Sequence, residues 1–159
     1  MNKIKIVILG LAHPHAATLY KTLAQYPDEV EFLGYADVPP YDDMPREERK
    51  KHLGKEAIDV LREYENWEDL VSLGPDLAIV TVDNRACGDL MCKLLSLGIA
   101  VVNEKPMTMD YADAKRVAEC AKKNGVPYYV CANSAASAKL AESLIIKKIR
   151  KETAISEFK

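Results

Sequence analysis

The 159-residue chain has no apolar run that approaches the roughly 20 residues needed to span a bilayer. It also lacks an excess of either charge, because 22 Lys and Arg residues nearly balance 24 Asp and Glu residues. No general basic surface therefore favours nucleic acid or an anionic membrane as a partner. The N-terminus, MNKIKIVILG, reaches a turn residue too soon for a signal peptide, and we expect a cytoplasmic protein.

Cysteine pairs at metal-ligand spacing are also missing. The four cysteines, Cys87, Cys92, Cys120 and Cys131, form no C-x-x-C motif, and we expect reduced, mostly buried thiols. Only His13-x-His15 comes near the close spacing of a zinc site, and it lacks a second pair. The prediction is therefore that no metal is bound, with a metal site at the two histidines as the less favoured alternative.

Apolar stretches alternate with amphipathic ones, without an internal repeat or a low-complexity segment. Strands are expected at 3–9, 30–36, 77–82, 99–102, 127–132 and 154–158. Helices are expected at 14–25, 45–64 with a break near Gly54, 68–73, 86–97, 111–124 and 137–150. Nearly all-apolar strands separated by helices predict one α/β domain with a doubly wound, Rossmann-like parallel sheet. Ligands then bind beyond the carboxyl ends of the strands, at 10–15, 37, 81–84, 103–107 and 132–135.

The loop after the first expected strand, "VILGLAHPHA", has only one of the three glycines of a G-x-G-x-x-G phosphate loop. The three places hold Gly10, Ala12 and His15. Alanine adds one methyl group near the phosphates, whereas histidine is a larger departure. His13 and His15 could hydrogen-bond a phosphate, crowd the site or pack against the strand. The loop alone thus leaves a nucleotide site and a plain turn open.

An acid follows the second expected strand. Asp37 lies 27 residues after Gly10, where a carboxylate can accept hydrogen bonds from an adenosine ribose. The alternative is an aspartate that merely begins a loop. The next arginine is Arg46, and a carboxylate without an adjacent guanidinium repels a 2′-phosphate. The sequence therefore favours NAD over NADP.

The segment "VVNEKPM", 101–107, has glutamate, lysine and proline directly after a buried strand, where packing does not require them. With this E-K-P at Glu104, Lys105 and Pro106, the sequence resembles the Gfo/Idh/MocA family (glucose–fructose oxidoreductase / inositol dehydrogenase). "DLAIVTVDN" and "GIAVVNEKP" stand at the family's usual separation, and "MDYADAKRVAECAKKNGVPYYVCAN" continues like its next helix and strand. The resemblance covers essentially the entire chain.

The resemblance implies a role for each matching position. The positions expected around the cofactor are Gly10, Ala12, Asp37, Thr81, Asn84, Glu104 and Pro106, and the loop adds His13 and His15 beside them. Within this set the loop into Pro14 would hold the pyrophosphate, Asp37 the adenosine ribose, and Glu104 the nicotinamide ribose. Lys105 would be catalytic, polarising or protonating the oxygen on the carbon that exchanges hydride. Its peptide bond to Pro106 is expected to be cis.

The chain also departs from the family. After the third main strand it reads Thr81-Val82-Asp83-Asn84-Arg85-Ala86 instead of T-P-N-x-x-H, and no arginine closely follows Asn133. We expect a Rossmann domain at 1–150 and, at 151–159, a remnant of the first strand of a missing open-sheet domain.

Two functions remain open at this stage. The first is the cofactor domain of an NAD-dependent oxidoreductase for a sugar, polyol or related hydroxyl compound, inactive as this chain alone. The second is a non-catalytic nucleotide-binding or regulatory module. For either, we expect a homo-oligomer or a separate substrate domain as partner.

Overall fold

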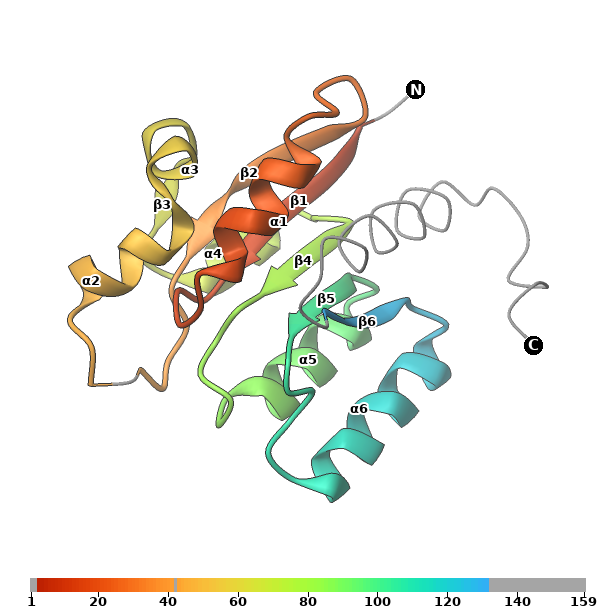
Figure 1. The fold of residues 1–159 in the computed structure, drawn as a ribbon. Helices are drawn as coiled ribbons and strands as arrows, with labels where there is room; N and C mark the ends of the chain where they lie inside the picture. Colours follow the sequence, from red (N-terminus) through yellow and green to blue (C-terminus); the bar gives the residue numbers. More distant parts are fainter. Residues whose placement is uncertain (1–2, 42, 132–159) are drawn as a thin grey trace.

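A computed structural model of the protein describes residues 3–41 and 43–131 and shows one six-stranded sheet (Figure 1). The strands are β1 (Ile4–Leu9), β2 (Val30–Ala36), β3 (Glu63–Tyr64), β4 (Leu77–Val80), β5 (Ala100–Glu104) and β6 (Tyr128–Cys131). Every pair of neighbours is parallel, in the order β3-β2-β1-β4-β5-β6. The doubly wound, Rossmann-like fold is therefore confirmed.

Helices cover both faces of this sheet (Figure 1). They are α1 (His15–Leu23), α2 (Arg46–Lys50), the 3₁₀ turn η1 (Lys51–Leu53), α3 (Lys55–Val60), α4 (Trp67–Ser72), α5 (Cys87–Ser96) and α6 (Tyr111–Asn124). The ends of α6 follow from its sequence. The Asp110 carboxylate accepts the N–H of Ala112 at 2.6 Å, and Gly125 closes the helix at φ +64°.

The alternation of side chains along β1 divides the core between the two faces. Ile4, Ile6 and Ile8 pack in one cluster with buried residues of α1, η1 and α3. Val7 and Leu9 point to the other face and pack in a second cluster with α4, α5 and α6. Because both faces of the strand are buried, it reads as a continuous apolar run.

The edge strand β3 corrects one expectation from the sequence. The helical stretch does break at Gly54, but it ends at Val60, and Glu63–Tyr64 pairs with β2. The Tyr35 N–H donates to the carbonyl of Arg62 at 3.0 Å. Gly34 permits this approach, since a Cβ there would lie 2.5 Å from the same carbonyl oxygen. A two-residue strand is too short to show alternation.

Within the described residues, no helix is both long enough and apolar enough to cross a membrane. The helix expected at 137–150, the strand expected at 154–158 and the site segment 132–135 lie outside the described residues.

Candidate functional site

Gly10 ends β1 in a conformation that only glycine adopts comfortably. Its φ is +89°, and an added Cβ would lie 2.6 Å from both the Val82 backbone nitrogen and the Val82 Cγ1 atom. The Thr81 hydroxyl donates to the Gly10 carbonyl at 2.8 Å, and the Ala12 N–H donates to the Thr81 carbonyl at 2.9 Å. The loop after β1 is therefore tied to the end of β4. Thr81 is fully buried and shapes this loop.

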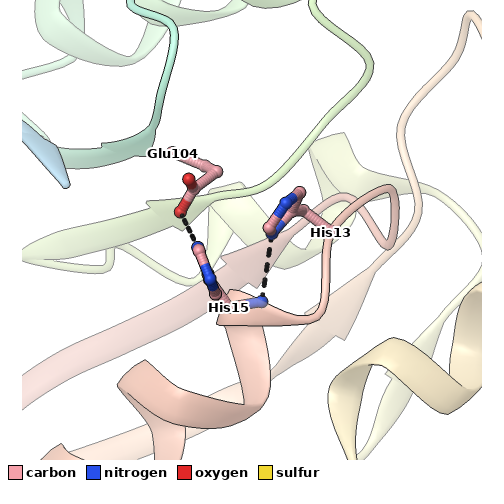
Figure 2. Close-up of side chains that lie close together, drawn as sticks. All are labelled: His13, His15 and Glu104. Atoms are coloured by element: carbon pink, nitrogen blue, oxygen red, sulfur yellow. Dashed lines mark hydrogen bonds and ion pairs between the residues drawn. The ribbon is translucent and has the colours of Figure 1, made fainter. Parts of the chain in front are cut away.

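The loop then enters α1 through two histidines. His15 is the first residue of α1, and its N–H donates to the Nδ1 atom of His13 at 3.3 Å (Figure 2). The imidazole of His13 thus receives an N–H at the helix N-terminus, where an anion would otherwise be held. Burial lowers the pKa of His13, with Glu104 opposing this effect, and a neutral ring is favoured. A neutral ring that accepts at Nδ1 carries its proton on Nε2.

Glu104, at the end of β5, reaches across to the same place. Its Oε2 atom lies 2.7 Å from Nδ1 of His15. Figure 2 marks this contact with a dashed line. The residue is only 6% exposed, and its Oε1 atom has no hydrogen-bond partner among residues 3–41 and 43–131. A buried carboxylate oxygen without a partner is costly, which marks a place for a donor or a cation.

The turn after Glu104 is fixed from inside the protein. Lys105 and Pro106 are exposed and are joined by a cis peptide bond, as expected. The buried Asn103 side chain donates to the carbonyl of Met107 at 3.2 Å and to that of Pro106 at 3.4 Å. Asn103 therefore positions the turn that presents Lys105, a role that its strand-end place in the sequence does not reveal.

Asp37 lies at the end of β2, as expected, but its surroundings differ from the prediction. Its carboxylate accepts two hydrogen bonds from Arg49, at 3.0 and 2.6 Å, and the N–H groups of Leu11 and Val38. Asp37 is 7% exposed and Arg49 5%. The premise that no guanidinium adjoins this acid is therefore wrong. Arg49 stands 12 residues later in a stretch of charged residues, where nothing in the sequence distinguishes it.

Beside Asp37, a cavity of about 270 Å³ lies between the segment after β2 and the start of α5. Its lining includes Val38, Pro39 and Pro40 on one side and Arg85 and Ala86 on the other. The exposed Asn84 adjoins Arg85, which pairs with Asp83 at 2.8 Å. Of the predicted site residues, the structure thus brings the loop after β1 together with Glu104 through His15 and with Asp37 through the Leu11 N–H. Asn84 directly precedes Arg85, which lines the cavity.

Comparisons with known proteins identify the family of this chain. Residues 41–132 match the model of the oxidoreductase family with an NAD-binding Rossmann fold (GFO_IDH_MocA). The match begins after Asp37 and so leaves out the unusual loop 10–15. Inositol 2-dehydrogenase of Salmonella typhimurium is 34% identical over 74 residues, which are 46% of this chain and 22% of the relative.

Solved structures share the fold. A putative oxidoreductase from Erwinia carotovora atroseptica has a TM-score of 0.69 at 20% identity. The match covers 90% of this chain and 41% of the Erwinia chain. The WlbA dehydrogenase from Chromobacterium violaceum, in complex with NADH and UDP-GlcNAcA, has a TM-score of 0.67 at 18% identity, covering 93% and 41%. This chain therefore spans less than half of these relatives. With its parallel sheet, its E-K-P turn and the family match over 41–132, the chain belongs to the Gfo/Idh/MocA oxidoreductases as an NAD-binding Rossmann domain.

Proposed function

We propose that this chain binds NAD(H) at the carboxyl edge of its sheet, for an oxidoreductase that acts on a hydroxyl group of a sugar, polyol or related compound. The observation that carries the proposal is the buried Oε1 of Glu104, which no described residue hydrogen-bonds, directly before the exposed Lys105. A hydroxyl of the nicotinamide ribose is a donor that would satisfy this oxygen. Pro106 completes the turn against which this part of the cofactor would lie.

The loop after β1 would hold the pyrophosphate. Gly10 and Ala12 give the loop its close approach to β4, and α1 follows with the positive end of its dipole toward the site. His13, neutral and protonated on Nε2, can donate to a phosphate oxygen. The His15 N–H becomes available to a phosphate once the long hydrogen bond to His13 opens.

The adenosine part of NAD(H) would lie next to Asp37, at the cavity that follows β2. The cavity lined by Val38 and Arg85 has room and apolar surface for a base, and Asn84 directly precedes Arg85. Asp37 would face the ribose with Arg49 behind it. Thr81 acts through Gly10, since its side chain is buried.

Lys105 would face the substrate. NAD(H), when bound, supplies or accepts the hydride. The ammonium group of Lys105 can stabilise negative charge on the substrate oxygen or give it a proton. Hydride transfer also needs a surface that binds the sugar and positions it against the nicotinamide. We expect that surface to come from a separate substrate domain or another copy of the chain, so the chain alone binds NADH without turnover.

The test is titration of the purified chain with NADH, followed by assays with NAD and a panel of polyols that includes inositol. We expect Glu104→Gln to weaken NADH binding about tenfold, because the loss of one hydrogen bond to a charged group has an effect of this size. The matched control is Glu68→Gln, because Glu68 is exposed on α4. Failure of the wild-type chain to bind NADH, or equal weakening by both variants, would overturn the proposal.

A further inference from the structure

Three side chains that can each ligate a metal ion converge at the end of β1. They are His13 and His15 around the start of α1 and Glu104 at the end of β5, with one ligand atom of each within 4.8 Å of the others. Figure 2 shows the two rings and the carboxylate turned toward one another. The two histidine ring centroids are 4.2 Å apart. The sequence shows only the histidine pair, since Glu104 is 89 residues from His15.

The carboxylate is not saturated by its present contacts. Glu104 uses Oε2 for His15, while its buried Oε1 has no partner in the part of the chain that the structure describes. The hydrogen bond between the His15 N–H and Nδ1 of His13 is 3.3 Å, at the long end of the range. A metal ion would therefore give Oε1 a partner, and coordination through Nδ1 of His13 would displace only this long hydrogen bond.

The charges around the site limit how tightly a cation can bind. Burial lowers the pKa of His13 most, and the charge of Glu104 raises it. His15, Lys105 and His52 lower this pKa further, so their charges also oppose a cation here. The N-terminus of α1 also opposes a cation. A doubly charged ion that forms coordination bonds can outweigh this opposition, whereas an ion held by attraction alone cannot. Two imidazoles and one carboxylate are the three protein ligands of many open zinc sites.

We propose that His13, His15 and Glu104 form a site for a divalent transition metal of the zinc class. Glu104 is also the residue proposed above for the nicotinamide ribose, so metal and NAD(H) would exclude one another. This second part rests on the proposed function, whereas the metal site itself does not.

The first experiment titrates the chain with Zn²⁺ by calorimetry and with Co²⁺ by visible absorption, without nucleotide. His13→Ala, His15→Ala and Glu104→Gln should each weaken metal binding about tenfold or more, while His52→Ala should leave it within about twofold. His52 is the matched control, because it is the remaining histidine of the sequence and does not belong to the cluster. Its Nδ1 atom lies 2.9 Å from the carbonyl oxygen of Leu11. Circular dichroism verifies that each variant is folded.

A measurement on the wild type alone guards against variants that do not fold. Zn²⁺ should shift the ring resonances of His13 and His15 and leave those of His52 in place. Equal shifts at all three rings, or no binding by the wild type, would overturn the metal site.

The second experiment repeats the Zn²⁺ titration with saturating NADH. The expected result is at least about tenfold weaker metal binding. Unchanged affinity would overturn the exclusion and leave the metal site standing. A chain that binds Zn²⁺ at the cluster but no NADH would overturn the proposed function instead.

Discussion

Arg49 donates two hydrogen bonds to a single carboxylate oxygen of Asp37, while the other oxygen of Asp37 accepts two backbone N–H groups. Arg49 also stacks on the ring of Tyr41 at 4.6 Å. The carboxylate of Asp37 is therefore buried together with the guanidinium of Arg49. Under the proposed function, the balance between these two charges would decide which ribose the site accepts.

Removal of the acid should move the cofactor preference toward NADP. In Asp37→Ala, Arg49 keeps its hydrogen bond to the Met44 carbonyl but loses the carboxylate that balances its charge. A 2′-phosphate can then take the place of that carboxylate, because charged forked hydrogen bonds recognise phosphate well. We expect the ratio of NADP(H) affinity to NAD(H) affinity to rise about tenfold or more, because one charge-assisted hydrogen bond changes an affinity by about this factor. Paired titrations of both cofactors measure this ratio.

The double variant Asp37→Ala, Arg49→Met is the control, because it lacks both charges. It should not gain NADP(H) affinity. An unchanged ratio in the single variant would show that Arg49 does not face the ribose.

Gly10 should tolerate no side chain. Gly10→Ala forces a positive φ on alanine and brings its Cβ to 2.6 Å from the backbone of Val82, so we expect a loss of about 2 kcal/mol or more. Gly74→Ala is the matched control, with φ +69° but nothing within 4 Å of the added Cβ, and should cost about 1 kcal/mol. Urea denaturation compares the two, and equal costs would contradict the close approach of the loop to β4.

The ion pairs of Glu63 should make stability depend on pH. Burial raises the pKa of Glu63, but hydrogen bonds from Lys50 and Tyr35 outweigh it, and the net pKa is lowered. A lowered carboxyl pKa stabilises the fold above the unfolded value and loses this effect as pH falls through the folded value. Glu63→Gln should therefore cost about 1 kcal/mol at pH 7 and progressively less below the ordinary value of 4.5.

Denaturation curves at pH 7 and in acid test this dependence. Glu68→Gln is the comparison, because its pair with Lys93 is half-exposed and should contribute little at either pH. A cost for Glu63→Gln that persists unchanged in acid would contradict the assignment.

Two cysteines are placed to form a bridge between helices. The Sγ atoms of Cys92 on α5 and Cys120 on α6 are 2.9 Å apart, although all four thiols are free. A diazene oxidant such as diamide should take one hydrogen from each thiol and join them. Burial raises the pKa of Cys92 to about 11, so the reaction should quicken toward alkaline pH.

Peptide mass mapping after oxidation identifies the bridge. Cys92→Ser should abolish it, whereas Cys131→Ser should not. Cys87 is buried, with its pKa raised to about 11 by burial, and should remain unmodified. A bridge that includes Cys87 would contradict the described packing.

The sequence predicts the sheet edge that carries the site because parallel strands all end there. It predicts Gly10, Asp37 and Glu104 as strand-end residues, and the caps of α6 follow from local rules. It cannot predict Arg49 beside Asp37, since that contact depends on the path of the chain between β2 and α2. The pairing of His15 with Glu104 is likewise a product of the fold, because β1, which leads into His15, and β5, which carries Glu104, are joined only through β4.

The most direct test of the account is an assigned ¹H–¹⁵N spectrum of the chain titrated with NADH. Binding at the carboxyl edge predicts shifts of the amides at 10–15, at Asp37 and Asn84, and at Glu104 and Lys105. Amides at the opposite edge, such as Asp76, Gly98 and Gly125, should not move. No shifts at saturating NADH, or shifts centred on that opposite edge, would contradict the account.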